Sequence, residues 1–357
     1  MSLNQNSCSK SNFEKVMEFN RAFDMVEQEP IKYTAYTTDN NGNITYNPFM
    51  NARKKISCAI IKLRLDLIKE EIEELIDATK QNDIIEQRDA CADILYVVYG
   101  MADVMGIAIN DVFKHKIYEK ITKYYNNKQH IDNIQNNSYP ITEITEITNG
   151  VSTIRINNEY TNEVNEVNDV NKYFNSIRKY SNFNYVKHFY YELLGYNVKE
   201  LNVNKVIEYI ITKLTTNYTA LEYICNNYLN SIYSVDSVDS VDIDNINTIF
   251  ETMSCKLYKL LRWVYILTLI LKIDADADFD IIHNSNMSKL CDNEEDANLT
   301  VNYYKDKFLT GLYAYDSPYY YYLPNINKWI VKNLSSGKAL KNINYKAVSF
   351  SNSRFVF

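Results

Sequence analysis

The chain has 357 residues and a formal net charge of −7, with 38 Lys and Arg against 45 Asp and Glu. Because a nucleic-acid-binding face needs clustered basic residues, this balance argues against a DNA- or RNA-binding protein. Only 7 Gly and 5 Pro, together with 46% hydrophobic residues, favour a mostly helical protein with enough apolar side chains for a core.

No segment of the sequence has the features of a secretory signal or a membrane span. Residues 1–10 lack an apolar stretch, and the most apolar run, Leu260 to Leu271, is shorter than a bilayer and contains Arg262. The six cysteines show no C-x-x-C spacing, so we expect reduced thiols. These features predict a cytoplasmic protein with neither a membrane nor a nucleic acid as partner.

The first predicted helix spans residues 13–26. Its apolar residues recur at helical spacing: Val16, Phe19, Phe23 and Val26. Pro30 follows, and the residue before a proline disfavours helix. The next stretch, from Ile31 to Asn51, is polar and rich in turn formers, so we expect a loop that helps to cover the functional site.

The stretch from Leu63 to Gly100 predicts two helices joined by a short turn. The first helix carries an apolar stripe at steps of three and four residues: Ile61, Leu65, Ile68, Ile72 and Leu75. A polar break at residues 81–83 separates it from a second helix that is almost wholly apolar over residues 94–109. The rest of the chain is expected to be organised around this pair.

Four carboxylates interrupt the apolar faces of the two helices. Glu71 and Glu74 lie in a second stripe where the pattern asks for apolar side chains, and Asp89 and Asp93 lie one turn apart on the second helix. A buried ionised carboxylate is costly unless a cation compensates it, and no Lys or Arg recurs at matching spacing. Paired oxygen ligands on facing helices suit Mg²⁺ bound to phosphates. Spacing alone leaves a solvated acidic face equally open.

The middle of the chain contains low-complexity segments. Triplets recur at residues 141–148, 162–171 and 235–242, and we expect surface loops without chemistry there. A short helix is predicted around residues 112–125. Further helical runs are predicted at residues 183–196, 206–229 and 246–271.

The later helical runs repeat the pattern of the first half of the chain. The matched pairs are Val16 with Val186, Phe19 with Phe189, Ile61 with Ile207, Leu65 with Ile211, Leu75 with Leu221, Val98 with Val264, Tyr99 with Tyr265, Phe113 with Phe279 and Lys123 with Lys289. The acids are absent from the second copy, where Asn217, Ala220, Cys255 and Lys259 stand at the positions of Glu71, Glu74, Asp89 and Asp93. An unrelated helical insertion whose patterns align by chance is the alternative.

A polar motif ends the last predicted helix of the second copy. Its side chains are His283, Ser285, Asn286, Ser288 and Lys289. Such donors near a helix end suit phosphate oxygens, and a polar helix cap is the alternative. Further on, residues 329–331 and the run Ser335 to Lys338 predict a small β-hairpin. Lys338 and Lys341 are expected to reach phosphates, although surface lysines are commoner.

The run LIKEEIEELIDA followed by DACADILYVVYG resembles the all-α NTP pyrophosphohydrolase superfamily. This superfamily includes MazG-like proteins, dimeric dUTPases and phosphoribosyl-ATP pyrophosphohydrolases. The resemblance places the family's Glu-Glu-x-x-Glu motif on Glu70, Glu71 and Glu74, and its second-helix aspartate on Asp93. The polar motif and the tail resemble a subset of the superfamily found in phages, large DNA viruses and protists.

One departure from the family pattern concerns the second helix. The partner acid usually lies three residues before the aspartate, where this chain has Ala90, so Asp89 or Glu86 is expected to serve instead. The resemblance also extends to the first helix, where Asn20 is expected either to face a base or ribose or to be an ordinary polar helix residue.

The resemblance implies an all-α fold, an antiparallel helix bundle made of two tandem MazG-like copies as an intrachain pseudo-dimer, with a small C-terminal β-hairpin. The expected divisions are 13–130 for the copy with the metal-binding carboxylates, 131–180 for a linker, 181–300 for the degenerate copy with the polar motif and 301–357 for the tail. A homodimer of such pseudo-dimers is left open.

The resemblance further implies Mg²⁺-dependent hydrolysis of a nucleoside triphosphate to the monophosphate and pyrophosphate, with Mn²⁺ as an alternative metal. The expected metal ligands are Glu71, Glu74, Asp89 and Asp93. Glu70 or Glu71 is expected to act in catalysis, Glu70 as general base if it does not ligate the metal. The expected substrate-binding residues are Asn20, His283, Ser285, Asn286, Lys289 and Lys338.

Two alternatives remain for the function. Phosphoribosyl-ATP pyrophosphohydrolase is the rival within the same chemistry, although that group lacks the polar motif and the hairpin tail. A non-catalytic nucleotide-binding or structural pseudoenzyme is the rival outside it. Since residues 117–123 of the first copy lack the polar motif and the second copy lacks the acids, we expect one composite site formed by both copies.

Overall fold

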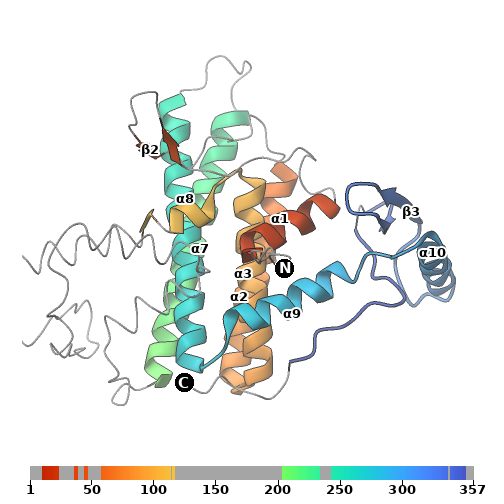
Figure 1. Cartoon of the computed structure of the whole chain (residues 1–357). Helices are drawn as coiled ribbons and strands as arrows, with labels where there is room; N and C mark the ends of the chain where they lie inside the picture. The colour runs from red at the N-terminus through yellow and green to blue at the C-terminus, as the bar shows by residue number, and fades with distance from the viewer. Residues whose placement is uncertain are drawn as a thin grey trace, which may run out of the picture. The chain divides into compact units, whose positions relative to one another are not determined.

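A computed structural model of the chain describes residues 10–23, 36–38, 44–46, 58–113, 115–116, 203–233, 243–336 and 338–350. The chain divides into two compact units. The parts of unit 1 are Met1–Tyr33, Asn51–Ile107 and Ile273–Phe357, and those of unit 2 are Thr34–Met50 and Ala108–Lys272. Helices dominate the described residues of both units, which confirms the predicted all-α class (Figure 1).

Helix α1 of unit 1, Asn12–Ala22, begins at a capping box. The Ser11 hydroxyl accepts a hydrogen bond from the Glu14 backbone N–H, and the Glu14 carboxylate accepts one from the Ser11 N–H. The helix buries Phe13 and Val16. The predicted first helix is therefore confirmed as far as Ala22, and its expected last residues, 24–26, lie outside the described residues.

Helices α2, Cys58–Gln81, and α3, Ile84–Val104, lie side by side as an antiparallel hairpin (Figure 1). The predicted apolar stripe of α2 is confirmed, because all five residues from Ile61 to Leu75 are at most 4% exposed. The predicted break is also confirmed: Asn82 takes a positive φ of 54°, and the Asp83 carboxylate caps α3. The second stripe of α2, which contains Leu63 together with Glu71 and Glu74, is less buried than its spacing indicated, since Leu63 is 45% exposed.

A buried polar network joins α1, α2 and α3. The Arg64 guanidinium donates to the Asn20 side-chain oxygen at 2.6 Å, and the Asn20 amide donates to the Asp103 carboxylate at 2.8 Å. All three residues are at most 4% exposed. Burial lowers the pKa of Arg64, whereas the Asp103 charge acts to raise it. Since the opposite charges and the hydrogen bonds lie within one network, it fixes the three helices relative to one another.

Two helices and a β-hairpin complete unit 1. Helix α9, Ala275–Met287, packs on α1 and α3 and ends at Ser288, as the polar motif predicted. Helix α10, Glu294–Leu309, was not predicted. Its signals were an Asn293 cap followed by an acidic first turn, and apolar residues that recur every three or four positions.

The C-terminal hairpin is present, but its main strands differ from the prediction. Strand β4, Lys328–Asn333, contains the predicted residues 329–331, and its partner is the preceding strand β3, Pro318–Leu323. The residues that follow Ser335, which were expected to form the second strand, make an isolated antiparallel bridge between Ala339 and Lys332. The tyrosine-rich run of β3 has the aromatic content of a strand, which the prediction overlooked.

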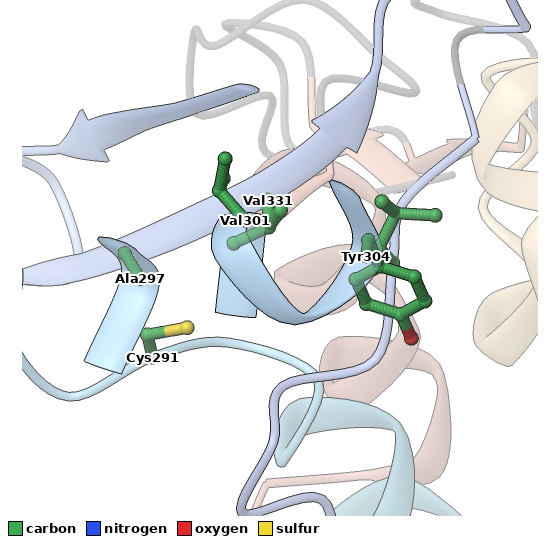
Figure 2. Close-up of a cluster of buried hydrophobic side chains, with 6 residues drawn as sticks. Cys291, Ala297, Val301, Tyr304 and Val331 are labelled. Carbon is green, nitrogen blue, oxygen red and sulfur yellow. The ribbon is translucent and has the colours of Figure 1, made fainter. Parts of the chain in front are cut away.

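Two apolar clusters hold the hairpin in unit 1. Figure 2 shows the first, which joins α10 to β4: Cys291, Ala297, Val301, Tyr304 and Val331. The second joins the end of α1 to the hairpin: Ala22, Phe23, Leu290, Leu323 and Ile330. The segment after α9 is therefore packed against the end of α1.

Unit 2 contains a second pair of long helices, α7, Val203–Tyr233, and α8, Ile243–Leu271. The helical residues 109–113 belong to the same unit, and the Phe113 ring lies 5.1 Å from the Tyr258 ring. These elements confirm the runs predicted at residues 206–229 and 246–271, whereas residues 117–125, 131–180 and 183–196 lie outside the described residues.

Unit 2 also corrects the prediction of a continuous loop from Ile31 to Asn51. Strands β1, Tyr36–Thr38, and β2, Ile44–Tyr46, pair antiparallel. Their aromatic and β-branched residues flank the Asn-Asn-Gly-Asn turn, so the turn signal was that of a hairpin rather than of a loop.

Two further observations on the described residues concern membrane spans and thiols. None of their helices combines the length and apolar character that a bilayer crossing requires. Cys58, Cys91, Cys225, Cys255 and Cys291 are free thiols, and Cys8 lies outside the described residues.

Gly100 on α3 lies against the buried polar network, and a Cβ atom there would come within 2.5 Å of Arg64 Nη1. A Gly-to-Ala change inside a helix ordinarily stabilises by about 1 kcal/mol. We expect Gly100→Ala instead to lower the free energy of unfolding by about 1–3 kcal/mol, because the guanidinium must move away from Asn20. Urea unfolding measures the change.

The control for this prediction is the same substitution in an Arg64→Met background. Without the guanidinium the added methyl group has room, so Gly100→Ala is expected to lose its penalty there. An unfolding free energy for Gly100→Ala equal to or above that of the parent protein contradicts the prediction.

Candidate functional site

The acids of α2 and α3 lie close enough to act on one another. Glu71 is half-buried, and burial is the main reason that its pKa rises to about 9. The charges of Asp93, Glu74, Glu70 and Asp89 raise it further, in that order. The structure thus brings together, in unit 1, the five acids that sequence and resemblance singled out.

Asp89 and Asp93 form the α3 side of this acidic cluster. Burial raises the pKa of Asp89 to about 6, and the charges of Glu86 and Glu74 add to the rise. Burial, with the Asp89 charge, raises the pKa of Asp93 to about 7. One Asp89 carboxylate oxygen is buried with no hydrogen-bond partner among the described residues. A buried, unsatisfied carboxylate oxygen is suited to a cation.

The acidic cluster fits a divalent metal by its chemistry, but its side chains are not preformed for one. Among the described residues, no group of three or more His, Cys, Asp or Glu is placed to hold a metal ion. Glu71 and Glu74 instead share a hydrogen bond, as two carboxyl groups do when one holds a proton. Metal binding therefore requires the proton to leave and the carboxylates to turn towards a common centre.

A cationic group faces the acidic cluster. Lys289 follows the end of α9, and its ammonium group donates to the Asn286 side-chain oxygen at 2.7 Å. Burial lowers the pKa of Lys289, the charges of Lys341 and Lys338 lower it further, and the Asp93 carboxylate opposes this. Lys289 is thus near an aspartate of the cluster, and Lys338 and Lys341 are near Lys289, which is an arrangement suited to a polyanion that also binds a metal.

Tyr96 connects α3 to the polar motif of α9. Its hydroxyl lies 3.2 Å from His283 Nδ1 and also hydrogen-bonds the Asn286 side chain. Its ring lies 5.3 Å from Phe279 and 5.4 Å from Phe19. Sequence reasoning assigned Tyr96 to the apolar core, although its position one turn after Asp93 was a usable signal.

Three of the predicted substrate-binding residues make contacts within the protein. Asn20 is fully buried, and both polar groups of its side chain are used by Arg64 and Asp103, so it does not face a base or ribose. The Ser285 hydroxyl lies 2.8 Å from the Tyr345 hydroxyl. Lys338 is exposed, with its ammonium group 5.7 Å from the Tyr315 ring centre, and its charge reaches Lys289.

Helix α9 is attached to α3 by a buried ion pair. The Arg88 guanidinium donates to both carboxylate oxygens of Asp278, at 2.6 and 2.8 Å. The Asp278 side chain is 2% exposed. A bidentate pair fixes orientation as well as distance, so it holds the first turn of α9 in register with α3, and Lys289 follows the other end of the same helix.

Comparison with known proteins found a family model and a relative that match the chain. Residues 47–120, which include α2 and α3, match the family model of phosphoribosyl-ATP pyrophosphohydrolase. An uncharacterized protein of Acanthamoeba polyphaga mimivirus is 28% identical over 347 residues, which cover 97% of this chain and 96% of that protein. No solved structure matches the chain.

The family match confirms the resemblance stated from the acidic motif. It supports a nucleotide pyrophosphohydrolase type of activity in general, that is, a hydrolase. Residues 47–120 are thus similar to a family of the MazG-like, all-α NTP pyrophosphohydrolase superfamily.

Proposed function

We propose that this protein is a Mg²⁺-dependent nucleoside triphosphate pyrophosphohydrolase that converts a ribo- or deoxyribonucleoside triphosphate and water to the monophosphate and pyrophosphate. The observation that carries the proposal is the placement of Lys289 beside Asp93, which puts a phosphate-binding cation against the acidic cluster. Acids without a neighbouring cation would suit a metal alone, whereas the combination suits a metal–phosphate complex.

Glu71, Glu74, Asp89 and Asp93 would hold the metal. Mg²⁺ bound there would neutralise charge on the phosphate oxygens and polarise the phosphorus that water attacks. Burial of Glu71, Asp89 and Asp93 makes their ionised forms costly without a cation, so the site is prepared to exchange protons for a metal.

Glu70 is the residue proposed as general base. It is exposed on α2, next to Glu71, so that water reaches it from solvent. In the reaction, the attacking water would give one proton to the Glu70 carboxylate, and the water oxygen would form a bond to phosphorus. The phosphoanhydride bond would then break, and its electron pair would go to the bridging oxygen of the leaving group.

Lys289 is proposed to bind the phosphates. Its ammonium group is held by Asn286 and is crowded by the charges of Lys338 and Lys341, so an arriving polyanion relieves a repulsion as well as forming a new contact. Asn286 is itself held by Tyr96, which keeps the donor set in place before the substrate arrives.

Phosphoribosyl-ATP is the second candidate substrate, because the family model that matches residues 47–120 carries that name. Both substrates contain a triphosphate and release pyrophosphate, so the acidic cluster serves either. They differ in the group attached to the base, and a direct comparison of turnover decides between them.

Pyrophosphate release from nucleoside triphosphates, deoxynucleoside triphosphates and phosphoribosyl-ATP in Mg²⁺ tests the proposal. We expect Glu74→Gln to lower kcat on the order of 10²-fold, because a charge that stabilises the transition state is lost. Lys289→Ala is expected to raise KM by about 10-fold or more with a smaller effect on kcat, as for a lost hydrogen bond to a charged group.

The matched controls are Glu73→Gln and Lys305→Ala. Glu73 neighbours Glu74 but pairs with Lys69 at 3.8 Å outside the cluster, and Lys305 is exposed on α10. Neither control is expected to change turnover by more than about twofold, as for surface residues away from a site. An absence of pyrophosphate release from every substrate, or equal losses in Glu74→Gln and Glu73→Gln, contradicts the proposal.

A second prediction concerns pH and metal. Because burial raises the pKa of Glu71 to about 9 and that of Asp93 to about 7, the folded protein holds protons that the unfolded chain releases. In EDTA the Tm is therefore expected to fall as the pH rises from about 6 to 9, as the folded carboxyl groups lose their protons. Added Mg²⁺ competes with these protons and is expected to raise the Tm more at pH 8.5 than at pH 6.

The double variant Glu71→Gln and Asp93→Asn is the control for this measurement. It lacks the two titrating groups, so both the fall in Tm with pH and the shift with Mg²⁺ are expected to shrink. A Mg²⁺ shift of the same size in the parent and the variant would place metal binding elsewhere.

A further inference from the structure

The two compact units do not follow the order of the chain. Unit 1 contains α1 to α3 and then, after a long excursion, α9 and the tail. Unit 2 contains the helical residues 109–113, which directly follow α3, together with α7 and α8. Each unit thus receives its helix pair from one half of the chain and its next helix from the other half.

The points at which the chain changes unit after each helix pair are equivalent to within one residue. After α3 the chain passes from unit 1 to unit 2 following Ile107, and after α8 it returns to unit 1 following Lys272. The spacing that separates Tyr99 from Tyr265 also separates Gly106 from Lys272, and these two residues both have a positive φ, 67° and 58°. A lysine rarely adopts the left-handed backbone conformation. Its occurrence at Lys272, the position matched to Gly106, therefore points to one backbone turn shared by the two units.

The contacts made by the exchanged helices are also equivalent. In unit 1 the Phe279 ring lies 6.0 Å from the Tyr99 ring at an angle of 87°. In unit 2 the Phe113 ring lies 6.0 Å from the Tyr265 ring at an angle of 86°. Phe113 matches Phe279, and Tyr99 matches Tyr265. The same edge-to-face pair therefore occurs in each unit, each time between residues from different halves of the chain.

The helix pairs agree in burial at several matched apolar positions. Matched residues that are at most 7% exposed are Ile61 with Ile207, Ile68 with Leu214, Leu75 with Leu221, Leu95 with Leu261 and Val98 with Val264. Chance alignment of two amphipathic patterns explains similar apolar spacing, but it does not explain a matched turn and a matched aromatic pair.

We propose that the two halves of the chain are copies of one helical unit that exchange their last helices, so that the second copy completes the site of the first. The predicted copies at 13–130 and 181–300 describe the sequence repeat, and the exchange describes how the repeats pack. The claim that the second copy completes a catalytic site rests on the proposed function. The exchange of helices does not depend on that function.

The proposal assigns a role to the Arg88–Asp278 ion pair. Ser254 and Val112 occupy the matched positions in unit 2, so this pair is specific to the docking of α9 in unit 1. Arg88 and Asp278 are thus positioning residues, which hold a helix donated by the second copy in the register that sets Lys289 beside Asp93.

The first test is to cut the connection between the copies. A site-specific protease sequence inserted between Gly150 and Val151 yields fragments 1–150 and 151–357 from the folded full-length protein. Since both units need helices from both fragments, we expect the fragments to elute together at the size of the intact chain and to melt in one transition. Fragments that separate without denaturant overturn the proposal, whatever the activity.

The second test distinguishes exchange from simple docking of two self-contained copies. Double-mutant cycles with Leu substitutions compare Phe279 with Tyr99 and Phe113 with Tyr265, and then compare Phe113 with Tyr99 and Phe279 with Tyr265. Exchange predicts that the first two pairs couple and that the last two are additive in unfolding free energy. Coupling within the last two pairs, with additivity in the first two, overturns the proposal. Leu keeps each position apolar, so the variants are expected to fold.

Discussion

The half-burial of several carboxylates on one helical hairpin is the constraint on which the rest of unit 1 depends. Two buried acid systems within the unit show the difference between a structural and a functional solution. Asp103 accepts from Asn20, which in turn accepts from Arg64, so its charge is balanced inside the protein. The acidic cluster is less completely balanced: Lys289 acts on Asp93, but burial still raises the pKa of Asp93, and Asp89 keeps a buried oxygen without a hydrogen-bond partner among the described residues. Such a cluster needs protons or a cation from outside.

The sequence predicted the parts of this arrangement that depend on local pattern. The apolar stripe of α2, the break at residues 81–83 and the carboxylates that interrupt the apolar faces all follow from helical spacing, and the structure places Glu71 near Asp93. Strands β1 and β2 were missed because the Asn-Asn-Gly-Asn signal was interpreted as a loop, although aromatic and β-branched residues flank it. Helix α10 was missed even though its cap and acidic first turn were present.

Other features could not be predicted, because they depend on which side chains meet in space. The position of Asn20 on α1 is compatible either with a contact to substrate or with a contact inside the protein. Its burial depends on Arg64 and Asp103, which both hydrogen-bond its side chain. Tyr96 is an ordinary core residue by pattern, and its contact with His283 joins helices far apart in the chain. The exchange of helices is invisible to periodicity, since both copies offer the same apolar face to either partner.

Under the proposed exchange, unit 2 lacks acids at the positions matched to the acidic cluster, so it needs neither protons nor a metal to balance them. At the position matched to Glu71, Asn217 is 8% exposed, and its amide donates to the Lys213 backbone carbonyl at 2.7 Å within its own helix. A neutral side chain with its hydrogen bond satisfied carries none of the repulsion that raises the pKa of Glu71. Under the proposed exchange, the second copy contributes α9 to the site, and the site needs nothing else from it. Decay of its own acids then removes a destabilising cluster without weakening the site to which it contributes.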